Sequence, residues 1–159
     1  MKNRGKQFES VIKEAFLKVD GVSIDRLHDQ MTGYKVTSKN ICDFIVYREP
    51  YEYYIECKSV HGASLPFSNI TDAQWNGLLQ KSTIQGVFAG VICWWIDKDV
   101  TKFIPIQALQ WNKEYGYKSL RYNHNGTSFV EIKGKKKRVF FEYDMEEFLD
   151  DLERIHSEV

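Results

Sequence analysis

Apolar side chains recur at helical spacing near both ends of the chain. The first stripe is followed by Gly21, a residue typical of a helix end. The second stripe follows Asp144, which together with Glu147 resembles an N-terminal cap. The stripes consist of Phe8, Val11, Ile12, Ala15, Phe16 and Val19, and of Met145, Phe148, Leu149, Leu152 and Ile155. Each stripe predicts a helix that packs one face against a core.

Two further helices are predicted in the interior of the chain. Thr71, followed three residues later by Gln74, has the form of a capping box. The apolar face behind it is supplied by Trp75, Leu78 and Leu79. Gly86 is expected to end this helix, and a shorter helix is predicted over residues 106–115.

Strand patterns fill much of the remaining chain. Residues 87–96 form a near-continuous apolar run, VFAGVICWWI, typical of a central strand covered on both faces. Residues 28–40 are polar and are predicted to form a loop. Further strands are predicted over residues 23–27, 41–47, 51–60 and 101–106, and a hairpin over residues 129–133 and 139–143 around Gly134 and the basic run 135–138. This succession predicts a mixed α/β fold, with helices covering a central sheet, in a single domain spanning residues 1–159.

Charge and cysteine content indicate where the protein works and how it could bind nucleic acid. The chain has 22 basic and 22 acidic residues, so any contact with nucleic acid must come from local clusters of charge. The cysteines are odd in number and lie in apolar stretches: Cys42, Cys57 and Cys93. Reduced core thiols of this kind, and an opening without an apolar signal segment, indicate a cytoplasmic protein that makes no use of a membrane.

The candidate chemistry lies in the two strand-like runs 41–47 and 51–60. On a strand, Glu56 and Lys58 share one face, with Tyr54 beside them. Asp43 is an acid among apolar neighbours, and a hairpin that separates it from Glu56 by 12 residues can bring the two carboxylates side by side. Two carboxylates at that distance repel each other unless a cation joins them, and Mg²⁺ is well suited to do so.

Such a site suits phosphodiester hydrolysis. The cation would polarise a phosphoryl oxygen and activate a water. Lys58 would position that water and balance charge in the transition state. An alternation of Tyr, Glu and Lys is equally typical of an edge strand protected from unwanted pairing. Asp43 favours the functional interpretation, because a charge among Ile, Cys, Phe and Val needs a reason.

Several polar residues carry two interpretations each. Gln74 closes the helix cap, or it contacts the attacking water or a phosphate. Glu9 is a solvated helix position, or it looks toward the edge of the core. Lys135, Lys136, Lys137 and Arg138 form a solvated turn, or they bind a DNA backbone.

These residues together resemble a known family. Asp43 followed by Glu56-Cys57-Lys58 is similar to the D…(D/E)xK signature of the PD-(D/E)XK nucleases. The opening Asn3-Arg4-Gly5 with Glu9 resembles the start of RecU-type Holliday junction resolvases. Pro66-Phe67, with Gln74 after it, resembles the segment that follows the lysine strand in that family. The segment between the first predicted helix and Asp43 is shorter than in RecU-type resolvases, which indicates a minimal or phage-type resolvase.

The resemblance implies a fold, a site and a substrate. The fold would be a PD-(D/E)XK nuclease-like core in αβββαβ order. Asp43, Glu56 and the Cys57 backbone carbonyl would bind Mg²⁺, for which Mn²⁺ would substitute. Lys58 would be the catalytic lysine, supported by Glu9 and Gln74. The protein would be a homodimer that resolves four-way DNA junctions in a bacterial or phage-infected cell.

Candidate DNA contacts and rival functions complete the hypothesis. The basic residues expected to bind DNA are Arg4, Lys35, Lys39, Lys135, Lys136, Lys137 and Arg138. A repair or restriction-type nuclease of the same superfamily would use the same chemistry on another substrate. A non-catalytic dimer that binds branched DNA would bind junctions without cutting them, and an interaction domain would show no salt-dependent DNA binding at all.

Overall fold

The computed structural model describes residues 3–28, 30–32, 35–38, 40–124 and 129–158. Its helices are α1 (Arg4–Leu17), α2 (Asp72–Ser82), α3 (Ile106–Glu114) and α4 (Met145–Ser157), with two 3-10 turns, η1 (Phe67–Asn69) and η2 (Ile96–Lys98). Its strands are β1 (Ser23–Arg26), β2 (Gln30–Thr32), β3 (Lys35–Ser38), β4 (Phe44–Arg48), β5 (Tyr51–Val60), β6 (Ser64–Pro66), β7 (Val87–Trp95), β8 (Val100–Pro105), β9 (Ser119–Arg121), β10 (Val130–Glu131), β11 (Gly134–Lys136) and β12 (Phe141–Tyr143).

The main sheet contains six strands in the order β1-β4-β5-β7-β8-β10. Strands β5 and β7 run parallel, and the other neighbours in this sheet pair antiparallel. Helix α2 lies between β5 and β7 in sequence and provides the crossover that a parallel pair needs. The succession α1, β1, β4, β5, α2, β7 confirms the expected αβββαβ order, with the hairpin β2–β3 inserted before β4.

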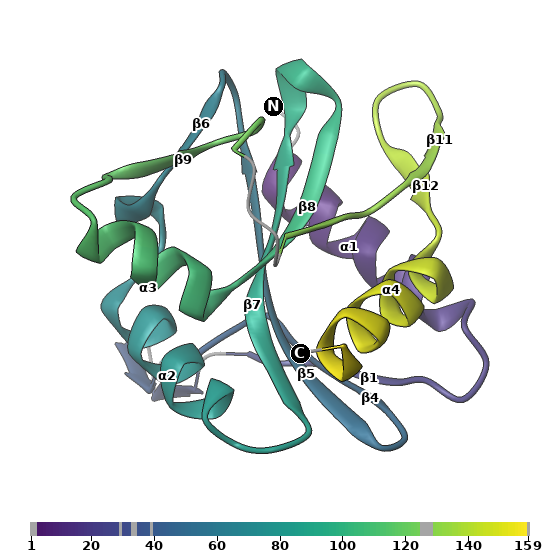
Figure 1. Ribbon diagram of the computed structural model, residues 1–159, viewed down its shortest axis with the longest axis horizontal. Coiled ribbons are helices and arrows are strands. Elements are labelled where there is room, and N and C mark those ends of the chain that lie inside the picture. Colours follow the sequence, from purple (N-terminus) through teal and green to yellow (C-terminus); the bar gives the residue numbers. More distant parts are fainter. Residues whose placement is uncertain (1–2, 29, 33–34, 39, 125–128, 159) are drawn as a thin grey trace.

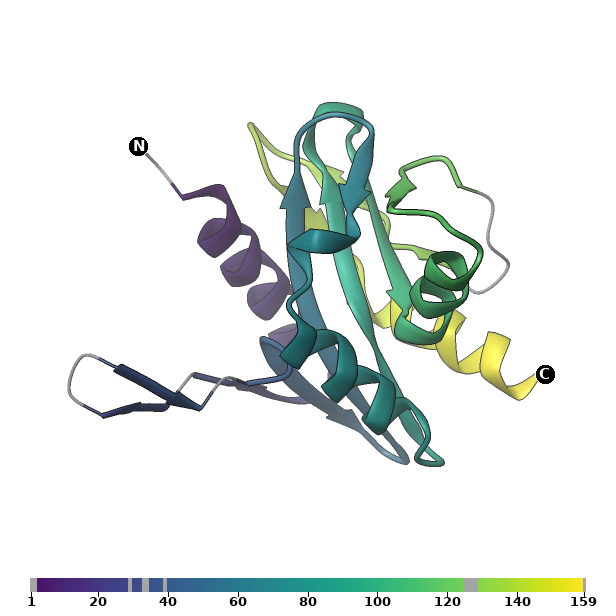
Figure 2. The same cartoon turned by 90° about the vertical axis from the view of Figure 1, so that its left-hand side faces the viewer.

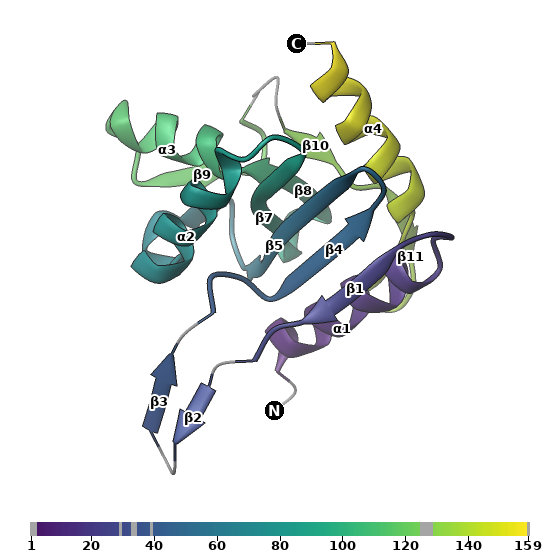
Figure 3. The ribbon, with the colours of Figure 1, turned by 90° about the horizontal axis from the view of Figure 1, so that it is seen from below.

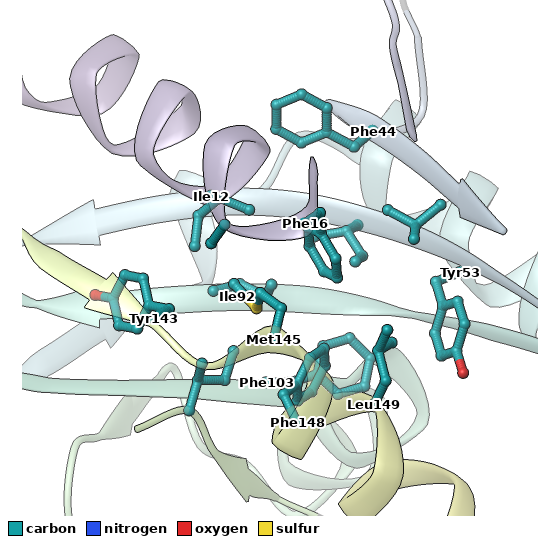
Figure 4. Packing of buried hydrophobic residues seen from close by; sticks show 14 of the residues in the cluster. Ile12, Phe16, Phe44, Tyr53, Ile92, Phe103, Tyr143, Met145, Phe148 and Leu149 are labelled. Atoms are coloured by element: carbon teal, nitrogen blue, oxygen red, sulfur yellow. The ribbon is translucent and has the colours of Figure 1, made fainter. Parts of the chain in front are cut away.

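Helices cover both faces of the sheet. Helices α1 and α4 lie on one side and α2 and α3 on the other (Figure 1). The α1–α4 side holds the larger apolar cluster, where Phe16 and Phe148 lie close to Ile92 and Phe103 (Figure 4). A second cluster, including Trp75, Leu78 and Val91, lies under α2 and α3. Strand β7 is buried along most of its length because it is covered on both faces, as its apolar run predicted.

The helix starts follow from capping chemistry. The Asn3 side chain accepts a hydrogen bond from the Lys6 amide at 3.2 Å, so the first residue of the Asn-Arg-Gly opening begins α1. Thr71 and Gln74 form the expected reciprocal capping box at the start of α2. The Asp144 carboxylate accepts from the Glu147 amide at 3.0 Å and begins α4. These contacts satisfy backbone donors that the first turn of a helix leaves unpaired.

The predicted loop over residues 28–40 is wrong in part. Strands β2 and β3 pair antiparallel within it, with Thr32 opposite Lys35. This hairpin projects from the body of the molecule beside the sheet (Figures 2 and 3). The polar sequence of residues 28–40 shows no apolar alternation, so the pattern indicated no strand there.

The predicted hairpin over residues 129–143 is also wrong in its pairing. Val130 and Glu131 join the main sheet opposite Phe103 and Lys102. The basic run expected at the turn instead begins with a strand, because Lys135 pairs with Glu142 in the separate ribbon β11–β12. Val130 is 4% exposed and so contributes to the core, whereas all of β11 is exposed. Burial of the valine favours the sheet edge over the local hairpin.

The three cysteines are buried and free, as expected of reduced core thiols. Burial raises the pKa of the Cys42 thiol to about 12 and that of Cys57 well above its usual range. Trp94 and Trp95 are also buried, as expected of the apolar run over residues 87–96 to which they belong. Among the helices that the structure describes, none is both long and apolar enough to cross a membrane.

Gly90 should be intolerant of a side chain. A Cβ built on Gly90 would lie 2.4 Å from the Ile104 carbonyl oxygen and 2.8 Å from the Phe103 ring, so backbone would have to move. Overpacking of this kind costs roughly 1–3 kcal/mol. We expect Gly90→Ala to lower the free energy of unfolding by that amount in urea denaturation. Leu17→Ala, at a side chain that is 55% exposed, should change it by no more than about 0.5 kcal/mol.

Candidate active site

The register of β4 and β5 brings Asp43 and Glu56 together. Phe44 pairs with Ile55, and the Asp43 amide donates to the Ile55 carbonyl at 3.1 Å, so the pairing extends one residue beyond β4. The Asp43 carboxylate then accepts from the Cys57 amide at 2.9 Å. Asp43 is therefore held opposite Glu56, as the length of the hairpin predicted.

Glu56 is the most buried acid of the site. Its side chain is 4% exposed. One carboxylate oxygen, Oε2, accepts from the Lys58 ammonium and from the Gln74 amide, each at 3.0 Å. The other oxygen, Oε1, is buried and has no hydrogen-bond partner within the described part of the chain. Burial and the neighbouring Asp43 raise the pKa of Glu56 well above its usual range, and Lys58 opposes that rise.

Lys58 extends from the same face of β5 as Glu56, as the strand period predicted. Its side chain is 19% exposed and reaches Glu56 directly. Val91 and Cys93 of β7, which pair with Glu56 and Lys58, are buried in the cluster under α2 and α3. The charged pair therefore lies at the margin of an apolar region, where electrostatic interactions are stronger than in water.

Gln74 closes the helix cap, as one of its two interpretations held, and it also contacts Glu56; its contact with the attacking water or a phosphate stays a prediction. Its carbonyl oxygen accepts from the Thr71 amide at 3.0 Å and closes the capping box. Its amide nitrogen donates to Glu56. The first turn of α2 therefore reaches into the acidic site, and the cap fixes which end of the Gln74 amide faces the carboxylate.

Glu9 joins the site through a residue that the sequence did not reveal. The Arg26 guanidinium donates to Glu9 at 2.8 Å and to Asp43 at 3.2 Å. Burial and Asp43 raise the pKa of Glu9, and Arg26 opposes that rise. Glu9 therefore lies at the acidic cluster rather than in open solvent. Only the pairing of β1 with β4, which sets Arg26 opposite Phe44, could have identified the arginine.

An open pocket of about 280 Å³ gives access to these groups. Its walls come from both flanks of the β2–β3 hairpin, from the two acids and from the start of α2. The lining residues are Arg26, Leu27, His28, Asn40, Cys42, Asp43, Glu56, Thr71 and Gln74. Lys58 and Glu9 are joined to this lining through Glu56 and Arg26.

Two adjacent carboxylates of the site could hold a divalent cation. Asp43 and Glu56 offer adjacent carboxylates, and Glu56 Oε1 is a buried acceptor without a partner within the ranges described. Within those same ranges, no group of three or more His, Cys, Asp or Glu side chains encloses a metal position. The fit therefore rests on two carboxylates, to which a hard cation such as Mg²⁺ needs to add only waters and substrate oxygens. The Cys57 carbonyl remains a predicted third ligand.

The basic residues expected to bind DNA differ in their surroundings. The Arg4 guanidinium lies 5.6 Å from the Phe140 ring centre. Lys136 pairs with Asp99 at 2.7 Å, and Lys137 pairs with Glu142 at 3.3 Å. Lys135 and Arg138 are exposed and have no ion pair in the described part of the chain. None of these five side chains lines the pocket of about 280 Å³.

Two predicted DNA contacts fall in the segment before Asp43. Lys35 begins β3, in the projecting hairpin, but its side chain lies outside the described part of the structure. Lys39 lies outside the described residues altogether. Their contact with DNA stays a prediction.

Comparison with solved structures finds a similarity to Hjc, a Holliday junction resolvase from the archaeal hyperthermophile Archaeoglobus fulgidus. The two chains are 19% identical, with a TM-score of 0.48, over 65% of this chain and 78% of that chain. No protein-family model and no curated protein matches the chain. The chemistry of the site is therefore inferred from its own side chains.

Arg26 should stabilise the fold through the acids that it joins. In EDTA, we expect Arg26→Met to lower the free energy of unfolding by about 1–2 kcal/mol, the lower part of the range for charged hydrogen bonds, because the arginine is 30% exposed. The same change in a Glu9→Gln, Asp43→Asn background should cost less, since no carboxylate is left uncompensated. Urea denaturation of the four proteins measures this coupling. Equal costs in both backgrounds would show that Arg26 acts through packing and through its hydrogen bonds to the Leu27 and Asp43 carbonyls, and not through the acids.

Proposed function

We propose that the protein is a Mg²⁺-dependent DNA endonuclease that cuts branched DNA, in the manner of a RecU-type Holliday junction resolvase. One observation carries the proposal. Asp43, just before β4, and Glu56 and Lys58 of β5 lie together, and a buried oxygen of Glu56 lacks a partner in the described structure. A purely structural ion pair would gain nothing from a second buried acid beside it.

Each residue has a part in the proposed hydrolysis. Asp43 and Glu56 would hold the cation, which supplies Lewis-acid activation of the phosphoryl group when bound. Lys58 carries three donors, one of which meets Glu56, so the others can orient a water or a phosphoryl oxygen. Its positive charge would stabilise the extra negative charge that develops in the transition state. Gln74 and Arg26 would act as positioning residues, because they hold Glu56 and Asp43 in place.

Branched DNA as the substrate is supported by the position of the β2–β3 hairpin. Residues 26–28 precede the hairpin and residues 40–43 follow it, and members of both segments line the pocket. The hairpin therefore leaves the body from the rim of the candidate site (Figure 3). A projecting ribbon at this rim would contact DNA beyond the scissile phosphate and favour a substrate whose arms diverge. A homodimer would provide two such sites for paired cuts.

Cleavage of a synthetic four-way junction tests the chemistry. We expect wild-type protein to nick the junction symmetrically in Mg²⁺ and not in EDTA. Lys58→Ala and Asp43→Asn should each lower the rate by at least about 10²-fold, because each removes a group that acts on the transition state. Junction affinity, measured in EDTA by fluorescence anisotropy, should remain within a few-fold of wild type for Lys58→Ala.

A matched lysine and a second substrate make this test specific. The Lys81 ammonium lies 5.2 Å from the centre of the Tyr54 ring, but within the described residues Lys81 makes no ion pair with Glu56, whereas Lys58 does. Lys81→Ala should cut at the wild-type rate. Equal cutting of a linear duplex would indicate a general nuclease instead. Junction cutting by Asp43→Asn at the wild-type rate would refute the proposed site.

The two unpaired basic side chains of the β11–β12 ribbon should contribute more to DNA affinity than the two paired ones. We expect Lys135→Ala with Arg138→Ala to reduce the slope of log affinity against log salt by about 0.9 for each DNA phosphate that the variant no longer neutralises. Lys136→Ala with Lys137→Ala should have a smaller effect, because these lysines already bind carboxylates. Equal reductions in the two double variants would mean that only net charge matters.

A further inference from the structure

A second and larger pocket lies beside the candidate active site. Its volume is about 750 Å³, within the range of roughly 300–1,000 Å³ that is usual for small organic ligands. It opens between the start of α2 and the end of α3, two helices that lie side by side (Figures 1 and 3). Thr71 lines both pockets, so the two pockets adjoin at this residue.

Both buried and exposed aromatic rings line the pocket. Phe67 and Trp75 are buried and meet edge to face, with ring centres 5.5 Å apart. Tyr117 also lines the pocket but is 55% exposed. A pocket that combines an exposed aromatic ring with buried ones is the kind of surface on which a planar base stacks.

Tyr117 is held in place by the end of α3. The Tyr117 amide donates to the Asn112 carbonyl at 3.1 Å, and the Gly116 amide donates to the Lys113 carbonyl at 3.0 Å. This pair of bonds is a Schellman motif, and it requires the positive φ that Gly116 adopts, 95°. The next residue, Lys118, accepts from the Phe67 amide at 2.9 Å. The backbone on either side of the exposed ring is thus fixed to the rest of the pocket.

The charges of the pocket suit a nucleotide. The Lys113 ammonium lies 4.6 Å from the centre of the Trp75 ring, and Lys118 lines the same space. Neither lysine has a carboxylate partner within the described ranges. Asp72, in the first turn of α2, is the acid of this lining. Two cations can meet phosphates, while a carboxylate can accept from the amino group of a base.

We propose that this second pocket binds one unpaired nucleotide of the DNA strand that enters the candidate active site. The base stacks on Tyr117, and its flanking phosphates meet Lys113 and Lys118. This inference rests on the proposed function, because the strand is the one whose phosphate reaches Asp43 and Glu56. It names the preferred substrate more closely: a junction or other branch with an unstacked base next to the cut.

Binding of single-stranded DNA in EDTA tests the proposal without cleavage. A fluorescently labelled oligothymidylate serves as the probe, and its fluorescence anisotropy is measured as the protein of residues 1–159 is added. Tyr117→Ala should weaken binding by about 5- to 150-fold, the usual effect of losing one stacked base. Tyr117→Phe, which keeps the ring, should bind within about 3-fold of wild type. Tyr47→Ala is the matched control, since Tyr47 is 47% exposed and does not line this pocket.

A strand of abasic residues separates stacking from charge. On this probe, wild type and Tyr117→Ala should bind equally, because no base is present to stack. Lys113→Ala should weaken binding to both probes and reduce the salt slope by about 0.7, the value for one neutralised phosphate of a single strand. Wild-type affinity of Tyr117→Ala for oligothymidylate would overturn the proposal. So would self-association of the wild-type chain that Tyr117→Ala abolishes in the absence of DNA, since the pocket would then belong to a protein interface.

These outcomes are independent of the proposed cleavage. If wild type cuts no DNA but shows the Tyr117-dependent binding, the nucleotide pocket stands and the catalytic proposal fails. If wild type cuts junctions and Tyr117→Ala cuts and binds as wild type does, the catalytic proposal stands and the nucleotide pocket is refuted.

Discussion

Mutual repulsion among Glu9, Asp43 and Glu56 is the constraint on which the site depends. The three carboxylates gather at the edge of an apolar core, and burial raises the pKa of both Glu9 and Glu56. Two cations of the chain itself oppose them: Arg26 joins Glu9 to Asp43, and Lys58 contacts Glu56. The three acids therefore outnumber the two basic residues by one. A site with this deficit favours a further positive charge, which a proton on one of the acids or a bound cation can supply.

The fold that enforces this crowding could be predicted largely from the sequence. The helical stripes, the capping box at Thr71 and the apolar run of β7 all occur where expected. The pairing of Asp43 with Glu56 followed from the length of the hairpin between them. These features are local, and each leaves a regular spacing in the chain.

Contacts between distant segments could not be predicted in the same way. Arg26 reaches Glu9 and Asp43 because β1 lies against β4, and no spacing in the sequence sets that register. Val130 leaves its neighbours in the chain to join β8, since burial at the sheet edge outweighs a nearby turn. The end of α3 forms a wall of the pocket beside the candidate active site, although the sequence indicated no function for this helix. Tyr117, just after α3, becomes part of a pocket only because α2 lies next to α3 in the fold.

The two bonds of the Gln74 side chain link a helix start to the ionisation of a strand residue. A capping box accepts Gln or Glu at this position equally well as far as the helix is concerned. Here a glutamate would satisfy Thr71 and at the same time place a fourth carboxylate against Glu56, where the amide now donates. Helix capping alone would tolerate glutamate at position 74, but repulsion from Glu56 of the neighbouring strand disfavours it. The presence of Gln rather than Glu at position 74 is therefore explained by the acidic site and not by the helix cap.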